Sequence, residues 1–155
     1  MTQPGDLART ARRIIDANSY MTLGTADADG RPWATPVWFA PDGYTDFIWV
    51  SRPGTRHSGN IADRPDVGIV IFDSTVPVGE AEAVYVEALA EQVPEVEVEA
   101  AITTFSAASA ADGGSPWQKS SVLGPAEFRL YRARASAHYL LGEKDSRVLI
   151  DPNAM

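Results

Sequence analysis

Three strand-like segments joined by two very short connections constrain the fold of this chain most. Segments 20–26, 32–40 and 45–51 are rich in β-branched and aromatic residues. The connections contain Asp-Ala-Asp-Gly at 27–30 and Pro-Asp-Gly at 41–43, and both are typical of tight turns. Connections this short cannot carry a crossover, so the three segments are predicted to pair as an antiparallel meander.

The rest of the chain favours an α+β domain dominated by antiparallel strands. Helices are predicted at 4–16, 55–63 and 94–111, and further strands at 67–72, 82–93, 128–141 (one or two strands) and 148–150. About six or seven short antiparallel strands tend to close into a barrel, because closure removes exposed sheet edges. We therefore expect one domain spanning residues 1–155, a β-barrel with flanking helices.

Three of these elements carry expectations about burial. The run 67–72 is apolar throughout, which predicts a strand buried on both faces. In the strand at 82–93, Tyr85, Glu87 and Leu89 share one side, a half-polar face typical of a barrel exterior or an interface rim. The helix at 94–111 is expected to present a partial apolar stripe consisting of Val96, Ala100, Thr103 and Phe105.

Composition excludes several classes of protein. The 155 residues carry a net charge of −8 and no cysteine. A surplus of acidic residues opposes binding to a phosphate backbone, and without cysteine there is no disulfide, thiolate nucleophile or cysteine-ligated metal. The N-terminus lacks the apolar segment of a signal peptide, and no apolar run approaches the about 20 residues that span a bilayer. We expect a cytoplasmic protein that binds neither nucleic acid nor membrane.

The common catalytic and nucleotide-binding motifs are absent. The sequence contains no G-x-G-x-x-G and no G-x-S-x-G. Residues 54–59 begin like a P-loop, but Asn60 and Ile61 occupy the positions that require Lys and Ser or Thr. His57 and His138 stand in no metal-ligand spacing. No metal site is predicted, and no catalytic acid or base is assigned.

A basic loop between a strand and a helix is the first candidate site. Arg52, Arg56 and His57 lie within it, and Thr55 and Ser58 add hydroxyl groups. Amides at a helix N-terminus point toward anions, and an arginine fork matches phosphate oxygens. Such a loop suits a phosphate monoester, with Arg56 as the main charged anchor and His57 as the secondary one. The alternative interpretation is an ordinary surface loop with a helix cap.

The second candidate feature is the cluster of aromatic residues on the neighbouring strands. Alternation places Trp33, Val37 and Phe39 on one face of the strand at 32–40, and Pro36 and Trp38 on the other. Core packing accounts for some of these side chains. Beside a phosphate loop, an aromatic strand also fits a flat aromatic ligand with a phosphate tail.

These segments occur in an order that resembles the pyridoxamine 5'-phosphate oxidase-like FMN-binding split-barrel superfamily. The resemblance covers about residues 5–140 and rests on LGTA at 23–26, DGRP at 29–32, TPVWF at 35–39, IWVS at 48–51 and TRHSGNI at 55–61, continued by 66–73 and 84–89. It implies a six-stranded split barrel, and a homodimer with two flavins at the subunit interface.

The resemblance also implies roles for individual residues. The flavin ring would lie along 35–38, that is Thr35, Pro36, Val37 and Trp38, and its ribityl and phosphate side would be lined by Trp49, Val50 and Ser51. Thr55, Arg56 and His57 would hold the phosphate, with Asn60 beneath it. Trp38 and Trp117 would flank the substrate.

The expected function is therefore that of an FMN-dependent oxidoreductase acting on a small molecule. The vitamin-processing oxidases of this superfamily are longer and end in an Arg-x-His pocket, whereas this chain has Arg132-Ala133-Arg134, so oxidation of pyridoxamine phosphate is not expected. The family often has lysine where His57 stands, which keeps a deazaflavin coenzyme-dependent reductase open as an alternative. A flavin-binding protein without turnover is the other alternative.

Overall fold

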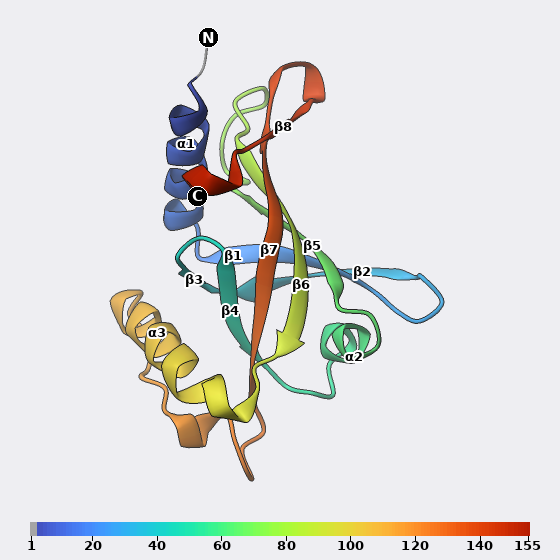
Figure 1. Cartoon of the computed structure of the whole chain (residues 1–155), viewed down its shortest axis with the longest axis vertical. Helices are drawn as coiled ribbons and strands as arrows, with labels where there is room; N and C mark the ends of the chain where they lie inside the picture. The colour runs from blue at the N-terminus through green and yellow to red at the C-terminus, as the bar shows by residue number, and fades with distance from the viewer. Residues whose placement is uncertain (1–2) are drawn as a thin grey trace.

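A single antiparallel sheet organises the molecule in the computed structural model, which describes residues 3–155. The strands in this part of the chain are β1 (Tyr20–Ala26), β2 (Pro32–Trp38), β3 (Ala40–Asp42), β4 (Asp46–Ser51), β5 (Asp66–Phe72), β6 (Ala83–Gln92), β7 (Arg129–Leu141) and β8 (Arg147–Leu149). They follow the order β2-β1-β5-β6-β7-β4-β3, and β8 pairs with β7. The sheet curls into a split barrel (Figure 1), which confirms the predicted fold class.

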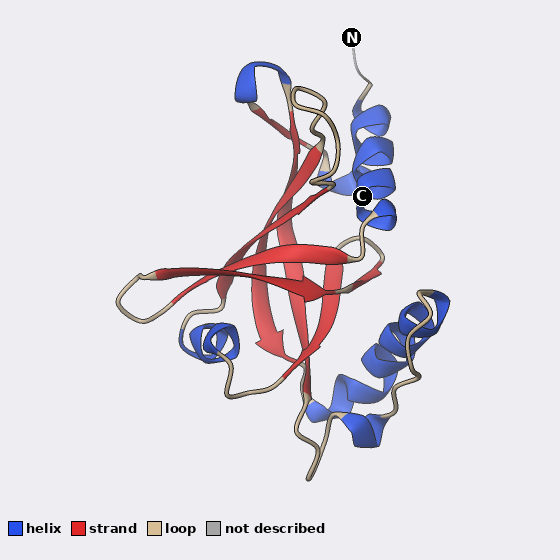
Figure 2. Cartoon of the chain, turned by 180° about the vertical axis from the view of Figure 1, so that it is seen from behind, coloured by secondary structure: helices blue, strands red, loops and turns tan. Residues whose placement is uncertain are grey.

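Three α-helices flank this barrel: α1 (Pro4–Ala17), α2 (Arg56–Asp63) and α3 (Val98–Ala111). Four short 3-10 turns, η1 (Glu95–Glu97), η2 (Lys119–Ser121), η3 (Glu143–Asp145) and η4 (Pro152–Ala154), complete the regular structure of residues 3–155. Figures 1 and 2 show α1 and α3 at separate places on the barrel, with α2 close to the β1–β2 hairpin. None of the helices in the described part of the chain is long and apolar enough to cross a bilayer.

The core has two parts. The larger cluster fills the barrel and the space beneath α1, and it includes the fully buried Phe47 and Trp49. The smaller cluster joins the sheet to α3 through Ile48, Ile102 and Phe105. Neighbouring residues of β4 thus point into opposite clusters, because successive side chains of a strand alternate between its two faces.

The predicted strand at 32–40 divides in two, so the predicted three-stranded meander is replaced by two separate hairpins. β2 pairs with β1, whereas β3 pairs with β4, and the backbone changes partner at Phe39, whose N–H donates to the Ser19 carbonyl. The turn between β3 and β4 lies later than the predicted 41–43, because within this segment Gly43 and Tyr44 adopt positive φ values of 60° and 59°. Two consecutive positive φ values suit the twist of a β-hairpin.

Three further expectations are corrected. β5 is buried on one face only: Val67, Ile69 and Ile71 face the core, whereas Gly68 and Phe72 are exposed, because one side of the sheet has no covering layer in the single chain. The predicted helix at 94–111 begins with η1, and α3 follows. Its buried face consists of Val98, Ala101, Ile102, Phe105 and Ser109, so of the predicted stripe only Phe105 is buried.

Other expectations are confirmed. The segment 128–141 forms one long strand, β7. Along β6, Glu87 and Leu89 are exposed and Tyr85 is half-buried, which agrees with the predicted half-polar outer face.

Candidate functional site

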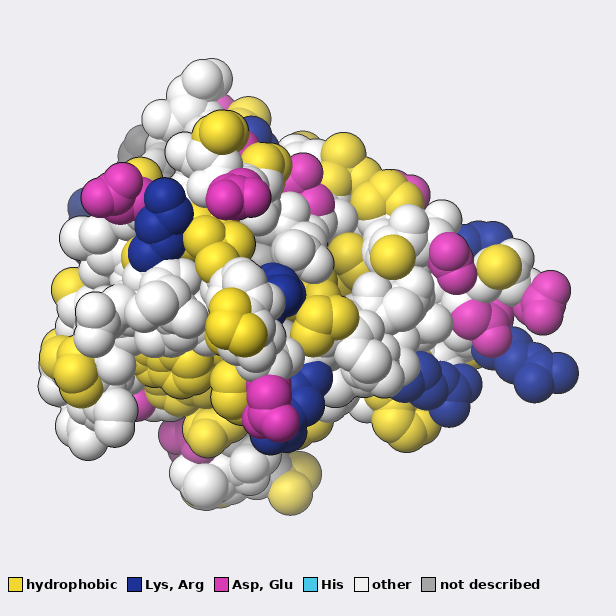
Figure 3. Space-filling view, turned by 90° about the horizontal axis from the view of Figure 1, so that it is seen from below, with side chains coloured by type: hydrophobic (Ala, Val, Ile, Leu, Met, Phe, Trp, Pro, Cys, Tyr) yellow, Lys and Arg dark blue, Asp and Glu magenta, His cyan; other side chains and the backbone are white. Residues whose placement is uncertain are grey.

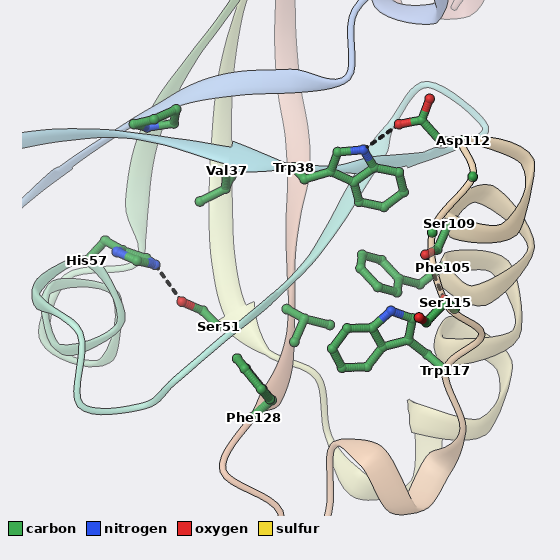
Figure 4. A pocket seen from close by; sticks show the side chains of 14 residues that line it. Val37, Trp38, Ser51, His57, Phe105, Ser109, Asp112, Ser115, Trp117 and Phe128 are labelled. Atoms are coloured by element: carbon green, nitrogen blue, oxygen red, sulfur yellow. Dashed lines mark hydrogen bonds between the residues drawn. The ribbon is translucent and has the colours of Figure 1, made fainter.

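A cavity of about 710 Å³ lies between β2, the end of β4, the start of α2, and α3 with the loop that follows it. Its lining includes seven of the site residues predicted from the sequence: Pro36, Val37, Trp38, Val50, Ser51, His57 and Trp117. Figure 4 shows the side chains of Val37, Trp38, Ser51, His57 and Trp117 around a common space. Segments far apart in the chain therefore meet where the motifs predicted a ligand.

The polar end of the cavity is built where β4 passes into α2. Ser51 is buried at the end of β4, and His57 is buried in the first turn of α2. The Ser51 Oγ and His57 Nε2 lie 2.7 Å apart, and the Thr55 Oγ1 lies 3.4 Å from the same nitrogen. Burial lowers the pKa of His57 below its ordinary value. The imidazole is therefore largely uncharged at neutral pH.

Hydrogen bonds of Thr55 and Asn60 fix the position of helix α2. Thr55 is its N-cap and accepts a hydrogen bond from the Ser58 amide at 3.3 Å. The buried Asn60 donates to the Thr25 Oγ1 at 3.0 Å, which joins α2 to β1. Thr55 and Asn60 thus support the wall of the cavity rather than line it.

Three predicted contact residues, Trp49, Arg56 and Thr35, lie outside the lining of this cavity. Trp49 is fully buried in the core and stacks on Tyr131 with ring centroids 5.8 Å apart. The exposed Arg56 lies over the ring of Trp33 at 4.3 Å, on the outside of the same loop. Thr35, on the edge strand β2, is outside the lining as well.

The opposite end of the cavity is aromatic, and the sequence did not predict that α3 contributes residues to it. Trp38, Phe105, Trp117 and Phe128 contact one another edge to face, with centroids 5.2, 5.7 and 5.8 Å apart along the series. Helical periodicity predicted Phe105 only as part of an apolar stripe, and periodicity alone cannot distinguish a core ring from one that borders a cavity.

The loop after α3 closes this end. The Trp38 Nε1 donates to the Asp112 Oδ2 at 2.8 Å. The Ser109 Oγ donates to the Ser115 carbonyl at 2.8 Å. A Cβ at Gly114 would come within 2.6 Å of the Ser109 Oγ, so only glycine allows the loop to pack this closely against α3.

Charged groups are sparse in the lining. Within residues 3–155, His57 and Asp112 are the ionisable residues that line the cavity. No group of three or more metal-ligating side chains occurs in the part of the chain that the structure describes. Seen from below, hydrophobic side chains occupy the hollow in this face, and charged ones are scattered around it (Figure 3).

The family model for pyridoxamine 5'-phosphate oxidase matches residues 7–140, and the chain belongs to that family. No curated protein sequence matches the chain.

Solved structures share the fold. A heme-binding protein from Mycobacterium smegmatis is 20% identical with a TM-score of 0.74, and the match covers 99% of this chain and 60% of that protein. HutZ, the heme storage protein from Vibrio cholerae, is 19% identical with a TM-score of 0.64, over 84% of this chain and 90% of that one. An F420 reductase is 21% identical with a TM-score of 0.56, over 77% and 87%.

Proposed function

We propose that the chain is a flavin-dependent oxidoreductase that binds FMN in the cavity between β2, β4, α2 and α3. The observation that carries the proposal is the convergence of Val37, Ser51 and His57 on one space. These residues come from three separate motifs, and each motif is expected to meet a different part of the same cofactor. Membership in the family supports the choice of a flavin.

The residues present fit the two ends of FMN. At one end, hydroxyl groups and an imidazole surround a compact space suited to a phosphate monoester. At the other, β2 is the terminal strand of the sheet, so one edge of its backbone has no strand partner among the described residues. That edge offers N–H and C=O groups to the polar rim of a flavin ring, although Pro36 has no N–H to donate.

Bound FMN would supply hydride transfer, and the protein would supply binding, orientation and exclusion of water. Ser51 and His57 would hold the phosphate, Thr55 would fix the loop behind them as the N-cap of α2, and Arg56 would add a permanent positive charge to the same loop. Pro36, Val37 and Trp38 would orient the ring together with the backbone edge of β2 at Thr35, and Val50 would lie against the ring. Trp38 and Trp117 would border the space left for a small-molecule substrate.

We further propose a homodimer with the cofactor at the subunit interface. The outer face of the sheet has no covering layer in the single chain and exposes Phe72 and Leu89. Between them lies a second cavity of about 430 Å³, lined by Val70, Tyr85 and Tyr139 among others. A second copy of the chain would cover this apolar surface.

A deazaflavin coenzyme-dependent reductase is the second candidate function. A buried, largely uncharged histidine at the phosphate end, where the family often has lysine, favours a cofactor whose phosphate demands less positive charge. The fold shared with an F420 reductase is consistent with it. A flavin-binding protein without turnover would have the same cavity and no reactivity toward a reductant.

Titration of the cofactor-free protein decides among these functions. FMN, riboflavin, FAD and a deazaflavin coenzyme are titrated in parallel by calorimetry, and hemin is titrated by absorbance because two neighbours are described as heme proteins. We expect FMN to bind at least tenfold more tightly than riboflavin, FAD or hemin, and NADH or NADPH to bleach the bound flavin. Preferential binding of hemin, or no flavin binding, would overturn the proposal.

A matched pair of variants tests the site itself. Ser51→Ala is expected to weaken FMN by about tenfold, since a hydrogen bond to a charged group contributes about 1.5–3 kcal/mol. Ser74→Ala removes an exposed hydroxyl in the loop after β5 and should leave FMN affinity unchanged.

A further inference from the structure

The two arginines at the connection between β4 and α2 are held in different ways. Arg52 pairs with the Glu127 carboxylate at 3.2 Å and lies over the ring of Phe128 at 4.8 Å. Arg56 pairs with no carboxylate within residues 3–155, and its guanidinium lies 4.3 Å from the centroid of the Trp33 ring. Arg56 is therefore the arginine of this pair whose charge is not already balanced by a carboxylate.

The partner of Arg56 is a weak one for a cation. An aromatic ring attracts a guanidinium through its quadrupole but leaves the positive charge in place. A phosphate offers charge-assisted hydrogen bonds that match the arginine fork, and these are stronger. From this contact we propose that Trp33 is a specificity-determining residue, whose ring holds the Arg56 guanidinium until the phosphate of the cofactor displaces it. The proposal rests on the FMN-binding function and assigns a role to a residue outside the cavity.

Both members of the contact lie beside the cavity without lining it. Trp33 is on the same face of β2 as Val37, because alternate residues of a strand share a face, and Val37 lines the cavity. Arg56 directly precedes His57, which lines the polar end. The Trp33 side chain is 40% exposed and Arg56 is exposed, so the guanidinium can leave the ring without disturbing the core.

Helix α2 keeps its place on the β1–β2 hairpin without this contact. Figures 1 and 2 show the helix close to the hairpin. The buried Asn60 donates to the Thr25 Oγ1 at 3.0 Å, and that hydroxyl donates to the Trp33 carbonyl at 3.4 Å. The backbone of β2 at Trp33 is thus joined to α2 independently of the ring. A substitution of the ring therefore tests the hold on the cation rather than the fold.

Competition for one cation has an unusual consequence for affinity. A molecule whose guanidinium lies on Trp33 must give up that contact before the phosphate can use it, so the apparent affinity is reduced by the fraction of molecules in which the guanidinium is free. Removing the ring in Trp33→Leu should therefore tighten FMN binding, by about two- to fivefold for an exposed contact of this kind. Riboflavin, which lacks the phosphate, should bind unchanged. Trp33→Phe keeps a weaker ring and should give an intermediate affinity for FMN.

A double-mutant cycle tests the competition. FMN and riboflavin are titrated by calorimetry into the cofactor-free wild type, Trp33→Leu, Arg56→Ala and the double variant. Arg56→Ala is the matched control, because without the guanidinium Trp33→Leu should leave FMN affinity unchanged. Unchanged or weaker FMN binding in Trp33→Leu, or the same tightening in the Arg56→Ala background, would overturn the inference.

A second measurement uses inorganic phosphate alone. The indole N–H signal of Trp33 in the NMR spectrum is identified by its loss in Trp33→Phe. We expect phosphate to shift this signal in the wild type, because the guanidinium leaves the ring, and to leave it unchanged in Arg56→Ala. Chloride at the same ionic strength is the control. No shift in the wild type, or a shift of equal size in Arg56→Ala, would overturn the inference.

The two proposals fail separately. If FMN does not bind, the flavin-dependent function fails, and the titration with inorganic phosphate still decides whether Trp33 and an anion compete for Arg56. If FMN binds and Trp33→Leu does not tighten it, the role of Trp33 fails alone.

Discussion

The Ser51 Oγ and the His57 Nε2 lie 2.7 Å apart, although one residue ends a strand and the other begins a helix. Both side chains are buried, and the burial lowers the pKa of His57. This pair defines the polar end of the cavity and supplies a group whose charge depends on pH.

The first prediction concerns that pH dependence. Because the pKa of His57 is lowered, the free protein has a neutral imidazole near pH 8, and a bound phosphate favours its protonated form. FMN affinity relative to riboflavin should therefore rise as the pH falls from 8 to 6.5, with uptake of a proton that calorimetry in two buffers detects. His57→Asn should remove this rise. An affinity ratio independent of pH in the wild type would contradict the prediction.

The second prediction concerns Arg56. We expect the exposed guanidinium of Arg56 to leave Trp33 and pair with the phosphate when FMN binds, so Arg56→Ala should weaken FMN by roughly tenfold to a hundredfold, because a charge-assisted contact contributes about 1.5–3 kcal/mol. Riboflavin, which lacks the phosphate, should bind unchanged. Near neutral pH, His57→Ala should reduce FMN affinity less than Arg56→Ala does. Arg64→Ala, near the other end of α2, is the matched control. If Arg56→Ala affects FMN and riboflavin equally, the guanidinium serves only its contact with Trp33.

The third prediction separates Trp49 from the cavity. Its side chain is fully buried, and its Nε1 has no hydrogen-bond partner. Trp49→Phe removes this unpaired donor while leaving a small void, so the net loss of stability should stay below about 2 kcal/mol. FMN affinity should change less than twofold, whereas Trp38→Phe should alter it more. A large loss of FMN affinity in Trp49→Phe would contradict the prediction and show that Trp49 contributes to FMN binding.

The fourth prediction concerns the ion pairs that hold the segment leading into α3. The buried Arg132 of β7 pairs with Glu91 at 2.6 Å and with Glu97 at 3.0 Å. Arg132→Met should lower the free energy of unfolding by about 1–3 kcal/mol, because it removes the charge-assisted hydrogen bonds to both carboxylates. The loss stays within this range because the half-exposed carboxylates regain water when the arginine is lost. Arg9→Met breaks the exposed ion pair with Asp6 within α1 and should change the free energy of unfolding by less than about 0.5 kcal/mol. Urea denaturation measures both.

The fifth prediction concerns assembly. Sedimentation should show a species of about twice 16.7 kDa. Val70→Arg, on the uncovered face of β5, should convert it to monomer and weaken FMN, because the cofactor is proposed to lie at the interface. Val96→Arg is the control, because Val96 is exposed and lies away from this face. A wild-type monomer at micromolar concentration would refute the dimer.

The sequence alone determined the features that depend on local chemistry. Short turns enforced the two antiparallel hairpins β1–β2 and β3–β4, alternation along β6 predicted its half-polar face, and the order of the motifs indicated the family. The motifs also predict that Val37, Ser51 and His57 contact one ligand; the structure shows that these residues line one cavity, and the ligand stays a prediction.

Tertiary structure decided what depends on contacts between distant segments. Periodicity could not show that Phe105 borders a cavity, because its partners Trp38 and Trp117 come from elsewhere in the chain. Nor could residue type show that the imidazole of His57 turns into the cavity while the guanidinium of Arg56 lies over Trp33. Adjacent side chains leave a helix about 100° apart, and only the packed surroundings fix which one faces the site.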